Sequence, residues 1–144
     1  MKKFTFELEK ILEFRDFEKK EAEGELAKAL AVESEIQNKL NQIAMQFVAL
    51  DKYISGSRDF DDIVSMSRNK QLLNYQKEEL LKELSQAKIV SDEKRKILAE
   101  CMKKTTALEK MKEIQLGQYK EEVKRAESKR LQQIAISKIS SDHR

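Results

Sequence analysis

Two residues in the sequence are the obvious candidates for metal binding or nucleophilic chemistry. Cys101 is the single cysteine, and His143, next to last, is the single histidine. One of each is too few for a structural zinc site, which takes four ligands. The three glycines lie far apart, so they form no glycine-rich phosphate loop. We therefore predict no catalytic, cofactor-binding or metal-binding residues.

The carboxylates do not change this prediction. The chain has 26 acidic and 29 basic residues, and their interleaving is typical of solvated ion pairs on helix faces. A paired-carboxylate active site needs a pocket, which a hairpin of two helices does not form. Cys101 falls on a stripe of apolar residues, where we interpret it as a small buried hydrophobe rather than a nucleophile. The sequence is thus not expected to be that of an enzyme.

The composition favours long helices over a globule. Charged residues make up 38% of the chain, proline is absent and glycine occurs three times, so the usual turn formers are scarce. Disorder is the competing interpretation, and the regular apolar spacing argues against it. No stretch approaches the roughly 20 apolar residues that span a bilayer. With a single cysteine and a charged N-terminal region, we expect a cytoplasmic protein.

The first predicted helix covers residues of about 4–54. Apolar residues recur in alternating steps of four and three, the spacing of a coiled coil. Three of the fourteen positions are polar, namely Arg15, Lys19 and Glu33. The stripe consists of Leu8, Leu12, Arg15, Lys19, Ala22, Leu26, Ala29, Glu33, Ile36, Leu40, Ile43, Phe47, Leu50 and Ile54.

The second predicted helix covers residues of about 59–140, after a turn at about 55–58 around Gly56. Asp59 is a candidate N-cap, with Asp61 and Asp62 in the first turn. The apolar stripe contains Ile63, Met66, Leu73, Leu80, Leu84, Ala87, Leu98, Cys101 and Leu108, and it is interrupted by Lys70, Lys77, Ser91, Lys94 and Thr105. A new register then contains Leu116, Tyr119, Val123 and Ala126, and another contains Leu131 and Ile134. These phase changes resemble stutters.

These elements predict an all-α fold with one domain over 1–144, a long antiparallel two-helix coiled-coil hairpin with a C-terminal helix overhang. Folding the chain at Gly56 places Ile54 near Ile63 and Leu8 near residue 109. The second helix should then be unpaired from about residue 112. Residues 112–144 carry a net charge of +3 and keep an apolar stripe, which is only marginally stable in water as an isolated helix. We expect this segment to bind a partner.

Aromatic residues crowd the first turns, off the stripe that Leu8 and Leu12 define. Phe4, Phe6, Phe14 and Phe17 either wrap around the opposing helix or face outward as anchors for a partner, and the sequence leaves both options open. Tyr75 near the turn is undecided in the same way.

The opening segment carries a family resemblance. The chain opens with Phe4-Thr5-Phe6-Glu7-Leu8-Glu9, followed by Ile11-Leu12 and Arg15. This segment resembles the start of the flagellar export protein FliJ. The length, the glycine-bearing turn before the middle, and the Leu72 to Tyr75 segment in a long second helix are also similar to that family.

The resemblance implies a component of the flagellar type III export apparatus, held at the cytoplasmic face of the inner membrane by that apparatus. It implies an antiparallel coiled coil whose termini insert into the hexameric export ATPase FliI, contacts with FliH and the export gate FlhA, and escort of unloaded export chaperones. The candidate ring contacts are Phe4, Phe6, Leu116, Tyr119, Val123, Leu131 and Ile134. The candidate gate contacts are Leu72 and Tyr75.

Other classes of protein fit less of the sequence. A structural or self-associating coiled coil, in which two overhangs zip together, would use the same stripe and is the main alternative. A prefoldin-like hairpin needs strands between the helices, for which Ser55–Asp59 is too short. Acidic residues interrupt every basic cluster, which argues against nucleic-acid binding, and no small-molecule site or membrane insertion is expected.

Overall fold

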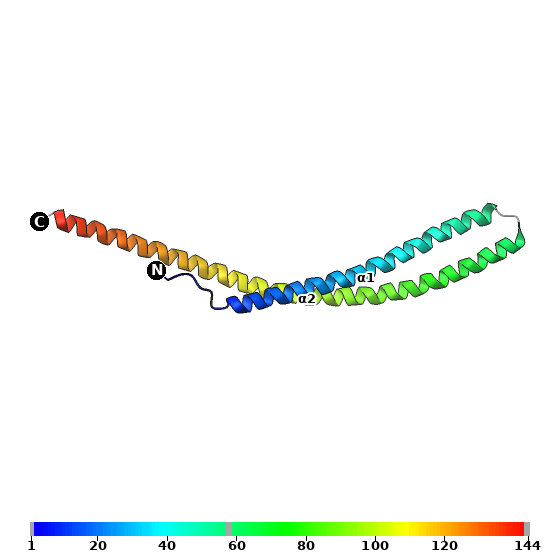
Figure 1. The fold of residues 1–144 in the computed structure, drawn as a ribbon, viewed down its shortest axis with the longest axis horizontal. Helices are drawn as coiled ribbons and strands as arrows, with labels where there is room; N and C mark the ends of the chain where they lie inside the picture. The colour runs from blue at the N-terminus through cyan, green and yellow to red at the C-terminus, as the bar shows by residue number, and fades with distance from the viewer. Residues whose placement is uncertain (1, 57–58, 143–144) are drawn as a thin grey trace. The chain divides into compact units, whose positions relative to one another are not determined.

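The computed structural model describes residues 2–56 and 59–142, which form two α-helices (Figure 1). Helix α1 is Glu9–Gly56, with 48 residues, and helix α2 is Phe60–Asp142, with 83 residues. The two helices pack against each other in opposite directions, and the described part of the chain has no strand. The predicted all-α hairpin of two unequal helices is confirmed.

The predicted turn at about 55–58 falls partly outside the described residues. Ser55 and Gly56 are the last residues of α1, whereas 57 and 58, like His143, lie outside the described ranges. At the start of α2, the backbone N–H of Asp61 donates a hydrogen bond to Asp59 Oδ1 at 3.1 Å, and Asp61 and Asp62 occupy the first turn. Asp59 therefore caps α2, as its residue type predicts.

The N-terminal boundary of α1 differs from the prediction. We expected helix from about residue 4, but α1 begins at Glu9. Residues 2–6 carry no regular structure, and the N–H of Glu9 donates to the carbonyl of Phe6 at 3.1 Å. Phe6 is only 5% exposed. Burial of this aromatic side chain outside the helix outweighs the cost of leaving the first residues unwound.

The chain divides into two compact units, each of which contains part of both helices. The first unit comprises Met1–Lys19 and Cys101–Arg144, and the second comprises Lys20–Glu100. Each unit is described below from the contacts within it.

The α1 stripe is confirmed at every position. All fourteen predicted residues are buried or half-buried, and four of them form much of the buried core of α1, namely Ala22, Ala29, Ile36 and Ile43. We call the stripe residues of both helices, where α1 and α2 pack together, the seam. Two of the four core residues are alanines, so the seam combines close contact between backbones with burial of larger aliphatic side chains.

The polar interruptions of the α2 stripe include the most buried side chains of the described residues. Ser91 is 0% and Thr105 is 1% exposed. In the second unit Ser91 Oγ donates to the Glu33 carboxylate. In the first unit Thr105 Oγ1 reaches the backbone carbonyl of Arg15 at 3.3 Å. A side chain as short as threonine can reach the opposite backbone only where two helices approach closely, so these polar residues mark tight packing rather than gaps in the core.

Lysines that interrupt the α2 stripe are paired with acids on α1. In the second unit Lys70 pairs with Asp51, and Lys94 lies 4.0 Å from Glu25. Lys77 is exposed, whereas the other four interrupting residues are buried or half-buried. Acidic side chains of α1 thus meet basic side chains of α2 at several heights along the hairpin.

These pairs correct the predicted register. Folding at Gly56 places Glu9 opposite residue 108, but Glu9 pairs with Lys112 at 2.8 Å. Asp51 likewise pairs with Lys70 rather than with residue 66. The helices are offset by about one turn from the symmetric fold, because the charge pairs and the close-contact residues fix the register and the position of the turn does not.

The predicted phase change in α2 is confirmed in the first unit. Half-buried residues follow the three-four spacing up to Leu108 and Lys112 and then continue at Leu116, Tyr119 and Val123. The step from Lys112 to Leu116 is four residues where three would keep the register. We expected α2 to be unpaired from about residue 112. Instead, Lys112 and Tyr119 both contact the N-terminal part of the chain.

Replacing Gly24 with alanine should stabilise the protein. Gly24 lies inside α1 without a positive φ angle, and an added Cβ would meet no atom within 4 Å. Gly24→Ala is expected to raise the free energy of unfolding by about 1 kcal/mol, because alanine loses less backbone entropy in a helix. Urea denaturation followed by circular dichroism measures this. A loss of stability would mean that this position does not tolerate an added Cβ.

Enlarging Ser91 should destabilise the second unit, although leucine is the usual choice for a coiled-coil stripe. Ser91 is fully buried between the helices and donates a hydrogen bond to Glu33. Ser91→Leu is expected to lower the free energy of unfolding by about 1–3 kcal/mol through overpacking. Ser85→Leu, at an exposed position of α2, is the matched control and should change stability by less than about 0.5 kcal/mol. Equal effects at both positions would contradict the close-packing argument.

Candidate partner-binding surfaces

The nine residues predicted to bind partners lie in two different parts of the molecule. Seven belong to the first unit and are Phe4, Phe6, Leu116, Tyr119, Val123, Leu131 and Ile134. The other two, Leu72 and Tyr75, lie near the beginning of α2 in the second unit.

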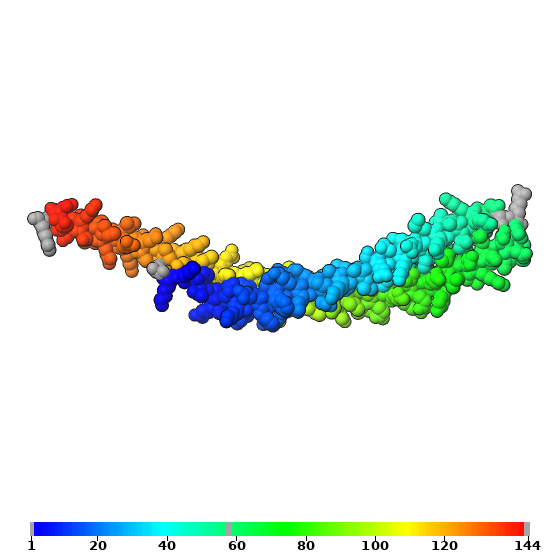
Figure 2. Space-filling view, viewed as in Figure 1, coloured from blue at the N-terminus to red at the C-terminus, as the bar shows by residue number. Residues whose placement is uncertain are grey.

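In the first unit, the chain before α1 lies against α2. We call residues 2–8 the N-terminal strap and Leu116, Tyr119 and Val123 the terminal stripe. The Phe4 and Tyr119 rings are in tilted contact, with centroids 5.6 Å apart, and the Tyr119 hydroxyl donates to the carbonyl of Lys2 at 2.7 Å. Figure 2 shows the dark blue N-terminal residues against the yellow to orange part of α2. The structure thus brings Phe4 and Tyr119 together.

The strap and the terminal stripe are partly covered. Phe6 is buried, and Phe4 and the three residues of the terminal stripe are half-buried. Residues 124–142, by contrast, are exposed throughout. The change from half-buried to exposed α2 therefore falls after Val123, about three helical turns beyond the predicted position at residue 112.

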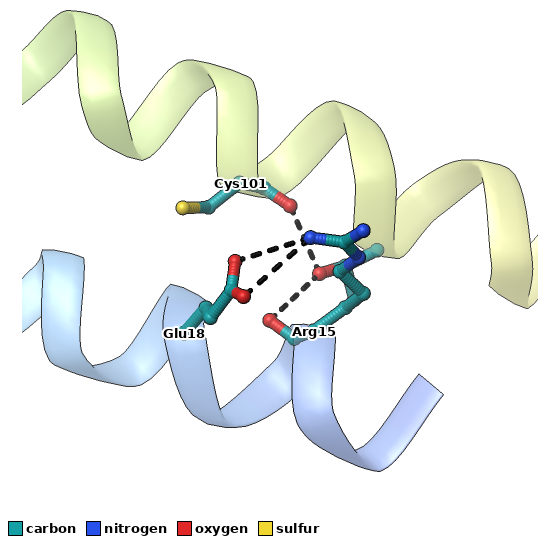
Figure 3. A network of polar contacts seen from close by, with 4 residues as sticks. Arg15, Glu18 and Cys101 are labelled. Atoms are coloured by element: carbon teal, nitrogen blue, oxygen red, sulfur yellow. Dashed lines mark hydrogen bonds and ion pairs between the residues drawn. The ribbon is translucent and has the colours of Figure 1, made fainter. Parts of the chain in front are cut away.

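Polar contacts hold the base of the strap in place. The Lys112 ammonium lies 2.8 Å from the Glu9 carboxylate, and both side chains are partly shielded from solvent. On α1 the Arg15 guanidinium lies 3.4 Å from the Glu18 carboxylate, and the two residues face Cys101 of α2 (Figure 3). Thr105 shares its hydroxyl proton between the carbonyls of Cys101, at 2.9 Å, and Arg15. This network is structural, because its groups bond one another.

Cys101 is half-buried on the seam. The network uses its backbone carbonyl rather than its sulfur. The described residues contain no group of three or more histidine, cysteine, aspartate and glutamate side chains that could hold a metal ion.

The exposed end of α2 carries large apolar side chains with basic ones between them. Leu131 is 66% and Ile134 is 49% exposed, and Ile136 and Ile139 are exposed as well. The charged residues of 124–142 are Lys124, Arg125, Glu127, Lys129, Arg130, Lys138 and Asp142. A single helix with this surface gains little stability from packing on its own chain.

In the second unit, Leu72 and Tyr75 are exposed beside shallow depressions between α1 and α2. Leu72 lines a depression of about 600 Å³ together with Tyr53 and Met66. Tyr75 lines a neighbouring depression of about 390 Å³ together with Gln46 and Leu80. Tyr53 is exposed at the end of α1, so aromatic residues of both helices border this surface.

Comparison with known families identifies the fold family. The model of the flagellar FliJ protein family matches residues 4–142. The chain belongs to the FliJ family. The match covers both units and all nine candidate residues. Members of the FliJ family are non-catalytic components of the flagellar export apparatus.

No curated protein and no solved structure matches the chain. Within the described ranges of this FliJ family member, neither helix is long and apolar enough to cross a membrane.

Sequence reasoning missed three features of these surfaces in this FliJ family chain. The sequence predicts the strap as the first turn of a helix, although Phe4 and Phe6 are two positions apart, the spacing of an extended segment. The pairing of Glu9 with Lys112 was missed because it depends on the register. Tyr53 is off the seam at the end of α1, and its spacing relative to Leu72 gives no signal in the sequence.

Proposed function

We propose that the protein is the stalk of the export ATPase ring, with its first unit inserted into the hexamer of FliI. It would also contact the export gate FlhA, act together with FliH and escort unloaded export chaperones. These contacts would hold it at the cytoplasmic face of the inner membrane. The observation that carries the proposal is the exposed end of α2, residues 124–142, in a chain that belongs to the FliJ family.

The chemistry of this segment supports insertion into a protein collar. Leu131, Ile134 and Ile136 are exposed, and such a surface on a lone helix is stabilised when a partner buries it. The segment carries five basic and two acidic residues. A partner that fits this surface offers apolar side chains at the centre of the contact and acidic side chains around it. We take Leu131 and Ile134 as the direct contacts.

The remaining proposed ring contacts lie at the base of the exposed segment. Phe4, Phe6 and the terminal stripe are packed on one another in the free protein. Leu116, Tyr119 and Val123 would add to the ring contact directly, whereas Phe4 and Phe6 would take part only through the strap that lies over this part of α2.

Charges placed at Leu131 and Ile134 should weaken binding to the ATPase. The double variant Leu131→Asp with Ile134→Asp is expected to lower affinity for FliI by at least about tenfold, since two apolar anchors are lost and two charges are buried. Titration with labelled protein measures the affinity, and stimulation of ATP hydrolysis by FliI should fall in parallel.

The matched control is Ile89→Asp with Ile97→Asp, two isoleucines that are 51% exposed in the second unit. This control should bind FliI as the unmodified protein does, and circular dichroism should show that both variants are helical. Unchanged binding by the Leu131 and Ile134 variant would refute the stalk proposal.

The exposed apolar residues of 124–142 also favour a second candidate function, a self-associating coiled coil. Sedimentation equilibrium separates the two functions. A dimer that the Leu131 and Ile134 substitutions dissociate would support self-association, and a monomer at all concentrations would exclude it.

The gate contact is proposed for the surface around Leu72 and Tyr75. Both side chains are exposed beside depressions, and the one beside Leu72 is also lined by Tyr53 of α1. Tyrosine and leucine next to a shallow depression fit a partner that inserts an apolar side chain between them. FliH and the export chaperones are proposed as partners without an assigned surface.

Truncating these two side chains should weaken gate binding selectively. Leu72→Ala with Tyr75→Ala is expected to lower affinity for FlhA by about tenfold, the effect of losing a small hot spot, and to leave binding to FliI unchanged. Val90→Ala, at another exposed position of α2, is the control. A variant that binds FlhA normally would exclude this surface, and a variant that loses FliI binding as well would show a general structural effect.

A further inference from the structure

The N-terminal strap covers a part of α2 that would otherwise continue the exposed apolar surface. Leu116 lies between two points at which the N-terminal part of the chain is attached, Lys112 in contact with Glu9 and Tyr119 in contact with Phe4. Leu116 is half-buried, whereas Leu131, one of the next apolar residues along the helix, is exposed. The strap thus shields the terminal stripe within the same chain.

The strap is attached by few interactions. Apart from the burial of Phe6 and the half-buried Leu8 at its end, the contacts that position it on α2 are the Phe4–Tyr119 ring contact and the hydrogen bond from the Tyr119 hydroxyl to Lys2. Other hydrogen bonds of the described strap residues are local, from Thr5 to Lys3, from Glu9 to Phe6 and from Leu12 to Leu8. The strap takes part in no helix or sheet ladder, so it can open while both helices stay intact.

We propose that the strap is an intramolecular cover that a partner displaces when it binds the terminal stripe. In the closed state Phe4 packs on Tyr119 and Phe6 is buried, so that the strap lies over α2 at Leu116. In the open state the terminal stripe joins Leu131 and Ile134 in one continuous apolar surface. This inference rests on the proposed function in taking the displacing partner to be the ring of the export ATPase.

The cover has a thermodynamic consequence for binding. If a partner binds only the open state, its apparent dissociation constant equals the dissociation constant for the open state divided by the fraction of protein that is open. Weakening the strap should therefore tighten binding to FliI without adding any contact. If the strap were instead a fixed part of the ring contact, the same change would weaken binding.

The state of the strap can be measured in the full chain without a partner. A maleimide reagent reports the exposure of a cysteine introduced by Leu116→Cys, in a background in which Cys101→Ala removes the native thiol. Leu131→Cys in the same background is the control at an exposed position. The Leu116 probe is expected to react more slowly than the Leu131 probe.

Releasing the strap should change both readouts. Phe4→Ala is expected to speed labelling at the Leu116 probe by about three- to tenfold, the range that corresponds to losing one aromatic pair, and to leave the Leu131 probe unchanged. Deletion of residues 2–6 should increase the labelling rate at the Leu116 probe further. Tyr119→Phe loses only the hydrogen bond to Lys2 and should increase that rate less. Phe14→Ala, an exposed aromatic residue of α1, should have no effect.

The binding measurement completes the test. Phe4→Ala without cysteine probes should bind FliI more tightly, by a factor similar to the labelling increase. Unchanged labelling would show that the strap does not cover Leu116, and unchanged or weaker binding would show that it is not displaced; either result overturns the inference. Failure of the stalk proposal is seen separately, as unchanged FliI binding by the Leu131 and Ile134 double variant.

Discussion

The packing of α1 on α2 depends on close contact between the helices at small and polar residues. Ser91 and Thr105 are the most buried side chains of the described chain, and each bonds to α1 within its own unit. Apolar stripes alone allow a helix to slide by a heptad with little loss of contact, whereas a buried hydroxyl must find its acceptor. The charge pairs Lys70–Asp51 and Lys112–Glu9 add the same constraint at other heights. These few contacts determine the register of the two helices. The register in turn determines where the residues of α2 change from half-buried to exposed.

The sequence was sufficient to predict the helices and their buried faces. All fourteen stripe positions of α1 are buried or half-buried, and the phase change before Leu116 is present, because three-four periodicity is a direct property of helical geometry. The register was not predictable in the same way. It depends on which polar residue of one helix meets which residue of the other, and periodicity in a single sequence treats Ser91, Lys94 and Thr105 alike as interruptions.

The partner-binding residues stay predictions, for which the structure gives the exposure of each side chain. Leu131, Ile134, Leu72 and Tyr75 are exposed, as a binding role requires. Phe6 is buried and Phe4 is packed on Tyr119, so both residues make contacts within their own chain. Periodicity could not reveal this, because the strap is not helical and its contacts join residues more than a hundred positions apart. The FliJ family assignment gives the setting in which these surfaces act, and the structure adds which of them are covered in the free protein.

The hydrogen bond from Thr105 ends on a backbone carbonyl, and this distinguishes it from the other contacts across the seam. Any amino acid at position 15 offers the same acceptor, so a change at Arg15 leaves the bond possible, whereas most changes at Thr105 remove it. The contacts Ser91–Glu33 and Lys112–Glu9 join two side chains and require both identities. In an alignment of the family, positions 33 and 91 and positions 9 and 112 should therefore covary, while position 105 should vary little and independently of position 15.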